Sequence, residues 1–279
     1  MSQFDGAQTQ FGFPKPGRAL IGALLTLFLL WLMFALAINW GDASPRLFEL
    51  FCGNTDAILR GELWRLFTAP LMHAHLGVGH IVWTLFGFYF LTPSLEQKWG
   101  GPRLLRFFAA SAVIAYGFQF LALLVLPASV GYKLAGEHWF GAFPVVEAVA
   151  IAWALSFKGQ TVRMFFVLPM TSTGLVWMVI GFSVLRVIGG AVPPEGLLSP
   201  FGGMFAGWLL GGGNPSPLRR WYLKLKLKQL DREADRVQNS RRDRVKDSPF
   251  QVIEGGKSRG SGKPTGKPGK RGPDGGWLN

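Results

Sequence analysis

The sequence predicts an all-α polytopic membrane protein in which six transmembrane helices form a bundle. Hydrophobic residues make up 49% of the 279 residues and charged residues only 16%, an apolar load that is heavy for a soluble domain. The apolar residues are gathered in long runs, and the basic residues are concentrated between some of these runs and near the C-terminus. Run length and charge bias are the signals that identify membrane spans and their orientation.

The first span is expected at residues 19–40, an uncharged run that follows Arg18. At about 1.5 Å per residue, this run is long enough to cross a hydrocarbon core of about 30 Å. It is longer than the apolar core of a cleavable signal peptide, and no small-residue cleavage site follows it. We therefore expect it to remain as an uncleaved anchor.

Five further apolar runs predict the remaining spans. The last run is rich in glycine, which suits a helix packed closely inside a bundle rather than one that faces lipid. The five runs are residues 77–91, 104–126, 140–157, 175–192 and 197–210.

The distribution of basic residues predicts that both termini lie in the cytoplasm. The segment after Gly211 holds 17 of the 29 Lys and Arg residues but 7 of the 16 acidic ones, so it carries +10 of the net charge of +13. The loops that would lie outside are poorer in basic residues, as the positive-inside rule requires. We expect a bacterial inner membrane. The single Cys52 cannot form an internal disulfide, so nothing depends on an oxidising compartment.

Two segments outside the spans carry structural signals of their own. The connection between the first two spans has about 36 residues and is rich in Trp, Phe and Leu, which predicts short helices in the membrane interface. After the last span, Leu223, Leu227 and Leu230 recur at helical spacing among basic residues. This pattern predicts an amphipathic helix, either bound to anionic lipid headgroups or stabilised in the cytoplasm by its own charge pairs. The alternation over residues 224–228 also permits a strand.

The predicted organisation has four parts. Residues 1–18 form a cytoplasmic segment, residues 19–211 the membrane domain, residues 212–254 a basic amphipathic juxtamembrane helix, and residues 255–279 a disordered basic tail. The tail is made of Gly, Lys, Pro and Ser, which cannot bury enough apolar surface to fold. No base-reading domain accompanies this charge, so no nucleic-acid partner is expected.

Residues 61–100 combine a Trp-Arg pair, three histidines, and a Glu placed four residues before a Gly, all around one span. Here the chain resembles the rhomboid superfamily of intramembrane serine proteases, in which these features precede, enter and end the second span. The resemblance covers about residues 45–211, is strongest over residues 61–211, and implies a rhomboid-like six-helix bundle with an interfacial first loop. The matching residues are Trp64, Arg65, Thr68, His73, His80, Glu96 and Gly100, with weaker agreement at residues 165–169 and 202–207.

The Trp-Arg pair and the Glu make sense as structural elements. A charged group near the bilayer is costly unless it is paired or lifted to the interface. We therefore expect Arg65 and Glu96 to hold the long first loop against the bundle.

The resemblance also implies where catalytic residues would stand. Rhomboid enzymes use a Ser in a Gly-x-Ser-Gly element at the start of the fourth span and a His before a Gly-rich stretch in the sixth. The matching element here begins at Gly141 and places Phe143 at the nucleophile position. Pro200 stands at the position of the base, ahead of Gly203 and Gly207.

A third departure concerns the oxyanion. In the family, a His followed four residues later by an Asn helps to hold it, and here Thr84 follows His80 at that spacing. Hydrolysis needs a nucleophile whose proton is taken by a base within hydrogen-bond reach, and neither a Phe nor a Pro ring provides one. We expect Phe143 to fill with hydrophobic volume the cavity that catalysis would need.

Other polar residues keep alternatives open. Ser172 and Ser199 are the remaining candidates for a displaced nucleophile, although neither has a His in its own span. Glu147, four residues after Phe143, is expected to face a polar cavity with Thr84 or His80, to lie near the interface, or to pair structurally.

The histidines suggest a metal site as a further alternative. His73, His75 and His80 could act as ligands with Glu137 and His138 nearby, because imidazole is a common metal ligand. Their spacing differs from His-Glu-x-x-His, so hydrogen bonding within the loop and span is the simpler role.

The sequence thus predicts a catalytically inactive rhomboid-like protein that binds transmembrane clients in trafficking, quality control or complex assembly, without a cofactor. Short aromatic-rich spans and an interfacial loop would thin the bilayer and admit a partner helix at the lateral face. Two alternatives stay open. One is an active intramembrane serine endopeptidase with a non-standard site, and the other is a metal-dependent membrane hydrolase that uses the three histidines.

Overall fold

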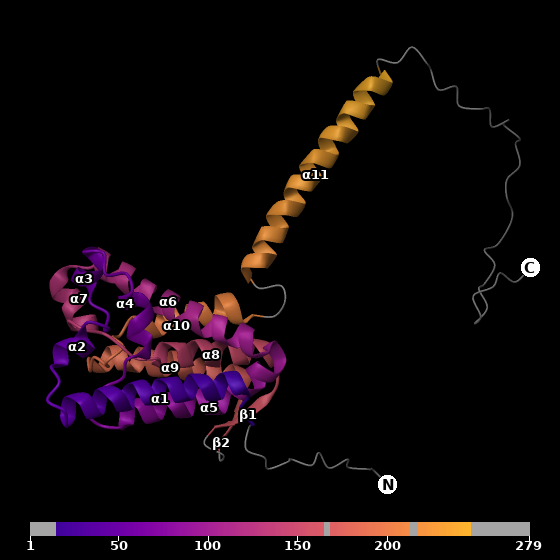
Figure 1. The fold of residues 1–279 in the computed structure, drawn as a ribbon. Coiled ribbons are helices and arrows are strands. Elements are labelled where there is room, and N and C mark those ends of the chain that lie inside the picture. The colour runs from indigo at the N-terminus through magenta and orange to yellow at the C-terminus, as the bar shows by residue number, and fades with distance from the viewer. Residues whose placement is uncertain (1–14, 165–167, 213–216, 247–279) are drawn as a thin grey trace, which may run out of the picture. The chain divides into compact units, whose positions relative to one another are not determined.

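The chain is largely helical in the computed structural model, which describes residues 15–164, 168–212 and 217–246 (Figure 1). The expected disordered tail at residues 255–279, most of the N-terminal segment and residues 165–167 of the weaker family match lie outside the described residues. The described residues up to Leu225 form one compact unit. The all-α polytopic fold that the sequence predicts is confirmed.

Six helices in the described part of the chain correspond to the six expected spans. Three of them, α1, α6 and α9, are long and apolar enough to cross a membrane, and α8 is a shorter apolar helix. Helix α5 continues past residue 91, where its apolar run ends, because Glu96 and Lys98 find backbone partners there. The helices are α1 (Arg18–Asn39), α5 (Gly79–Trp99), α6 (Gly101–Val125), α8 (Phe143–Ser156), α9 (Ser172–Gly189) and α10 (Ser199–Gly211).

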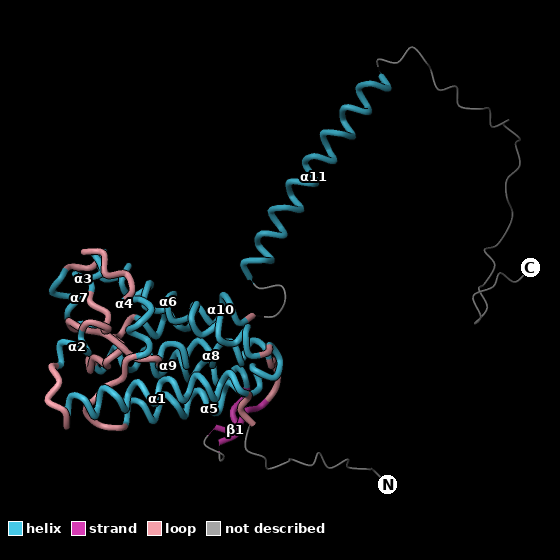
Figure 2. The backbone as a smooth tube through the Cα atoms, viewed as in Figure 1, coloured by secondary structure: helices cyan, strands magenta, loops and turns pink. Residues whose placement is uncertain are grey.

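Short helices and loops gather at one end of this bundle (Figure 2). Local capping explains two of the helices, since Ser44 and Asn54 accept hydrogen bonds from backbone N–H groups of the first turns of α2 and α3. Helix α7, in the third loop, was not predicted. The elements are α2 (Pro45–Glu49), α3 (Thr55–Leu59), α4 (Arg65–Thr68), the 3₁₀ turn η1 (Ala69–Leu71) and α7 (Ala128–Ala135).

Two further elements were not fully foreseen. The connection between α8 and α9 contains an antiparallel hairpin of β1 (Thr161–Met164) and β2 (Leu168–Thr171), with Thr161 opposite Thr171. Helix α11 (Pro217–Lys246) is continuous through the Lys-Leu alternation, so that alternation forms no strand. Its composition of Leu, Lys, Arg, Gln and Glu favours a helix.

Helix α8 is the centre of the bundle, between α5 and α10 (Figure 1). Every residue from Pro144 to Ala154 is buried. Because this segment is apolar on all sides except at Glu147, it can only be stable when enclosed by other helices. Its most extensive contact among the described elements is with α10.

Glycines of α10 allow this contact to be unusually close. A Cβ atom on Gly203 would meet the carbonyl oxygen of Pro144, and one on Gly207 would meet that of Ala148. Backbone therefore packs on backbone, as in other membrane helix pairs with small residues at the interface. The expectation that the glycine-rich sixth span packs inside the bundle is confirmed.

Replacing Gly207 with Val should destabilise the bundle by about 1–3 kcal/mol or more, because the added methyl groups collide with the α8 backbone. Thermal unfolding of the detergent-solubilised protein measures this effect. Gly117→Val in α6 is the matched control, since a Cβ there meets nothing within 4 Å. Equal losses for the two variants would show that α8 and α10 are not in close backbone contact.

Candidate functional site

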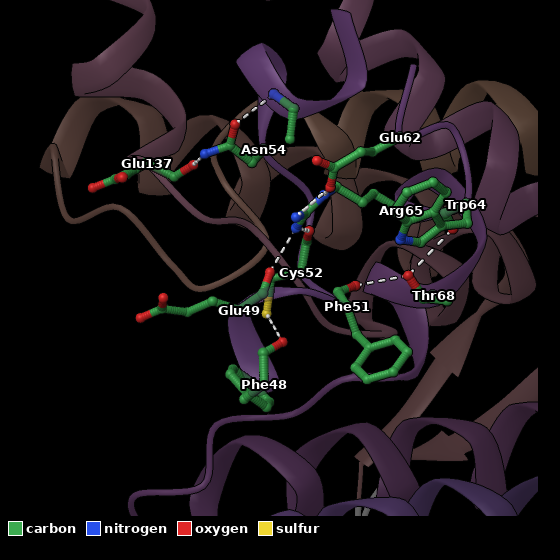
Figure 3. A network of polar contacts seen from close by, with 11 residues as sticks. Phe48, Glu49, Phe51, Cys52, Asn54, Glu62, Trp64, Arg65, Thr68 and Glu137 are labelled. Atoms are coloured by element: carbon green, nitrogen blue, oxygen red, sulfur yellow. Dashed lines mark hydrogen bonds and ion pairs between the residues drawn. The ribbon is translucent and has the colours of Figure 1, made fainter. Parts of the chain in front are cut away.

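Arg65 holds the first loop together (Figure 3). Its buried guanidinium donates hydrogen bonds to the backbone carbonyls of Glu49 (2.6 Å) and Cys52 (2.7 Å), and to the Glu62 carboxylate (2.7 Å). Trp64, the other member of the pair, is exposed. A buried guanidinium is tolerated when its donors are satisfied in this way.

Two neighbours complete this network. The Thr68 hydroxyl donates to the carbonyl of Phe51 (2.8 Å), which ties α4 to the segment after α2 (Figure 3). The thiol of Cys52 is buried, and burial raises its pKa, so it remains a neutral thiol.

Glu96 does not join the first loop, contrary to expectation. Its carboxylate accepts hydrogen bonds from the backbone N–H groups of Gly17 (2.8 Å), Ala19 (2.9 Å) and Leu20 (3.4 Å). These are unpaired donors at the start of α1, where the helix dipole also favours a negative charge. Gly100, four residues later, has φ 79° and lets α5 turn directly into α6. The Glu and Gly of this motif therefore organise the opposite end of the bundle.

The three histidines before and at the start of α5 are His73, His75 and His80, and each makes different contacts. Nδ1 of buried His73 lies 3.2 Å from the Leu71 carbonyl, and its ring centroid is 4.9 Å from that of His80. His75 packs edge-on against Phe48. Within the described ranges, no three His, Cys, Asp or Glu side chains are grouped so that they could hold a metal ion.

His80 is paired with Glu195, from the loop between α9 and α10. Nδ1 of His80 accepts from the N–H of Ala74 (3.2 Å), so Nε2 carries the proton that bonds Glu195 Oε1 (2.9 Å). Glu195 is buried. Sequence reasoning missed this pair because the two residues are 115 positions apart and no motif marks Glu195.

Gly141 lies against this pair. Its φ is 123°, and a Cβ there would come within 2.8 Å of the His80 imidazole and 3.0 Å of Glu195 Cγ. Its carbonyl accepts a hydrogen bond from the buried Tyr116 hydroxyl (2.6 Å). Only glycine fits this position, for both conformational and steric reasons.

The three positions that depart from the catalytic pattern carry no free catalytic group. Phe143 is the first residue of α8, half-buried, with the Arg186 guanidinium 4.6 Å from its ring centroid. Pro200 is buried in the first turn of α10. The hydroxyl of buried Thr84 donates to the carbonyl of His80 (2.9 Å), within its own helix. Thr84 therefore does not replace the oxyanion donor in this conformation.

The remaining candidate serines are engaged elsewhere. The Ser199 hydroxyl donates to the carbonyl of Glu195 (2.7 Å), and Ser172 accepts from the N–H of Gly159 (3.1 Å). In the part of the chain that the structure describes, no hydrogen bond joins a hydroxyl or thiol to an imidazole.

A cavity of about 450 Å³ lies beside these positions, between α5, α8 and α9. Phe143 lines this cavity and does not fill it, so the expectation that its ring occupies the cavity is wrong. Glu147 also lines the cavity, and its Oε1 accepts a hydrogen bond from the Ser183 hydroxyl (3.0 Å).

The rest of the lining mixes polar and aromatic side chains. His80 lines the cavity, whereas Thr84 does not. The aromatic rings of Phe86 and Phe182 form exposed walls.

The geometry defines a polytopic helical membrane protein. Glycines of α10 pack closely against its central helix α8, and a cavity between α5, α8 and α9 lies next to His80. The Rhomboid domain family model matches residues 60–213, which is more than half of the chain, so the chain belongs to the rhomboid family. It is also 32% identical over 89 residues to the "Putative rhomboid protease YdcA" of Bacillus subtilis (strain 168). That match spans 30% of this chain and 40% of the relative's length.

Burial lowers the pKa of His73 to about 3, with the neighbouring His80 as a smaller cause. Because its pKa in the unfolded chain is near 6.5, His73 contributes stability that is complete above pH 6.5 and is lost as pH falls toward 3. Between pH 6.5 and 5 the loss should be about 2 kcal/mol. Chemical unfolding of the solubilised protein at several pH values measures it.

His73→Asn should flatten this pH dependence, whereas His138→Asn should leave it in place. If the wild-type protein and His73→Asn lost stability equally on acidification, the buried neutral imidazole would not be its cause.

Proposed function

We propose that this rhomboid-family protein does not cut peptide bonds and instead binds transmembrane client helices at the cavity between α5, α8 and α9. The observation that carries the proposal is the side chain at the start of α8. Phe143 occupies the family's nucleophile position, yet the cavity beside it persists and is lined by aromatic rings. A site that has lost its nucleophile but kept its cavity favours binding over chemistry.

The lack of an activated nucleophile among the residues that the structure describes supports this proposal. Acyl transfer needs a hydroxyl or thiol within reach of a base. His80, the imidazole nearest to Gly141, has both ring nitrogens engaged, by Ala74 and Glu195. The hydroxyl of Ser199 points to a backbone carbonyl.

The lateral position of the cavity supports a helical client. Residues of α5, α8 and α9 line the cavity, and they include the exposed rings of Phe86 and Phe182. A side face of this kind meets lipid or another transmembrane helix, and helix association in membranes relies on packing and interhelical hydrogen bonds. Such binding serves trafficking, quality control or complex assembly.

The charge distribution completes the proposal. If the protein lies in a bacterial inner membrane with both termini on the cytoplasmic side, the basic segment that includes α11 faces the anionic cytoplasmic leaflet. Basic residues near such a surface contribute about 1 kcal/mol each, so α11 is proposed to bind anionic headgroups.

A fluorophosphonate probe should label no serine of the purified full-length protein in detergent or in liposomes, because no serine among the described residues is hydrogen-bonded to a base. Mass spectrometry of tryptic peptides reports the labelling, with an active serine protease in the same membranes as a positive control. Labelling of one serine, lost in Ser199→Ala or Ser172→Ala, would establish an active endopeptidase.

Photocrosslinking in native membranes tests the binding face. With benzoylphenylalanine in place of Phe86 or Phe182, we expect crosslinks to transmembrane segments of partner proteins. The matched controls are Leu25 of α1 and Leu121 of α6, which are exposed apolar positions away from the cavity. Equal capture at all four positions would show that the cavity does not select clients.

A further inference from the structure

Two polar atoms at the cavity lack hydrogen-bond partners among the described residues. Glu147 is 5% exposed, and its Oε1 accepts from Ser183, but its Oε2 has no partner. Nη1 of Arg186 is also buried and without a partner. Both residues line the same cavity, and they form no ion pair with each other among the described contacts. Leaving a buried polar atom without a hydrogen bond destabilises the protein, so a ligand that satisfies both atoms recovers this cost.

The rest of this cavity is largely apolar. Along the helices away from Arg186, the lining consists of Phe90 and Leu91 from α5, and Leu175 and Met178 from α9. A ligand that fits must therefore have an apolar body and one polar group near the end of α9. A transmembrane helix with a single polar side chain has this character.

We propose that Glu147 and Arg186 recognise a carboxamide, the side chain of Asn or Gln, within the transmembrane helix of a client; this inference rests on the client-binding function proposed above. The amide oxygen accepts a hydrogen bond from Arg186 Nη1, and the amide NH₂ group donates one to Glu147 Oε2. A carboxamide carries both a donor and an acceptor, whereas an apolar side chain satisfies neither atom.

The hydrogen-bonding needs of the site select against other clients. A client carboxylate offers only acceptors and a client ammonium offers only donors, so neither satisfies both Arg186 Nη1 and Glu147 Oε2. A neutral group with both hydrogen-bonding functions satisfies both atoms, and placing it in the membrane costs less than placing a charge there.

Depth distinguishes the client helix from a lipid. Arg186 lies in the last turn of α9, whereas Ser183, which binds Glu147, lies one turn earlier, about 4.5 Å deeper in the span. A phospholipid with its phosphate at Arg186 would place ester carbonyls at the level of Glu147. Esters only accept hydrogen bonds, so they cannot donate one to Glu147 Oε2.

Peptide binding to the full-length protein in phosphatidylcholine nanodiscs tests this inference. The probes are labelled Leu/Ala-rich transmembrane peptides that differ at one position near one end, which is Asn, Leu, Asp or Lys, and energy transfer reports binding. The Asn peptide should bind roughly three- to tenfold more tightly than the Leu peptide. Glu147→Leu and Arg186→Leu should each remove this preference.

Control variants keep the test decisive. Arg106→Leu in α6 removes a cation whose Nε bonds a carbonyl of its own helix (3.2 Å), away from the cavity, and should preserve the preference. If Glu147→Leu does not fold, Arg186→Leu still tests the inference. Arg186 is only half-buried, so we expect its replacement by Leu to leave the fold intact.

The outcomes separate the two proposals. If none of the peptides binds the wild-type protein, the client-binding function itself is wrong. If the Asn and Leu peptides bind equally, or the Asp or Lys peptide binds more tightly than the Asn peptide, client binding stands and the carboxamide inference is wrong. A preference that disappears in phosphatidylethanolamine nanodiscs would assign the two residues to a lipid headgroup and overturn the inference as well.

Discussion

The close approach of α8 and α10 is the constraint on which the rest of the bundle depends. Helix α8 has almost no polar side chains and must be enclosed, and glycines at 203 and 207 let α10 reach its backbone. This contact also positions the two residues that the resemblance assigns to the nucleophile and the base. Phe143 precedes Pro144, whose carbonyl faces Gly203, and Pro200 lies one turn before Gly203 on α10. On that assignment, the α8–α10 packing holds a phenyl ring and a pyrrolidine ring where an active member of the family would need a nucleophile and a base.

The buried ionic groups are distributed according to what each end of the bundle needs. Arg65 satisfies loop carbonyls at one end, and Glu96 satisfies the free N–H groups of α1 at the other. His80 and Glu195 join the second helix to the loop before α10. Glu147 and Arg186 are different, since each keeps an unpaired atom at the cavity. Among the buried groups named here, the two unpartnered atoms at the cavity are those at which we propose that a client binds.

Sequence reasoning located what depends on local pattern. Apolar run length located the six long helices of the bundle, of which α1, α6 and α9 are long and apolar enough to cross a membrane. The small residues of the last run indicated its close packing. The Trp-Arg motif pointed to a structural arginine, but the partner of Glu96 was wrong because a carboxylate at a helix end gives no sign of which neighbouring helix it caps. The hairpin was missed because its strands are only four residues each. Glu195 and Arg186 were missed because their partners come from distant segments.

The retained cavity was the least predictable feature. A bulky side chain at position 143 suggested a filled site, yet its ring lies along the wall with Arg186 against it. Whether a side chain plugs or lines a cavity depends on its rotamer and on the surrounding helices, which no local pattern encodes. The site beside Phe143 is therefore open and not filled by its ring.

The most direct test of this account is to look for cleavage in a membrane. The full-length protein is reconstituted in liposomes with a set of transmembrane helices, and the helices are analysed by mass spectrometry after long incubation. The account predicts that every helix is recovered intact, including those that copurify with the protein. Cleaved fragments that no longer form when Ser199 or Ser172 is replaced by Ala would contradict it.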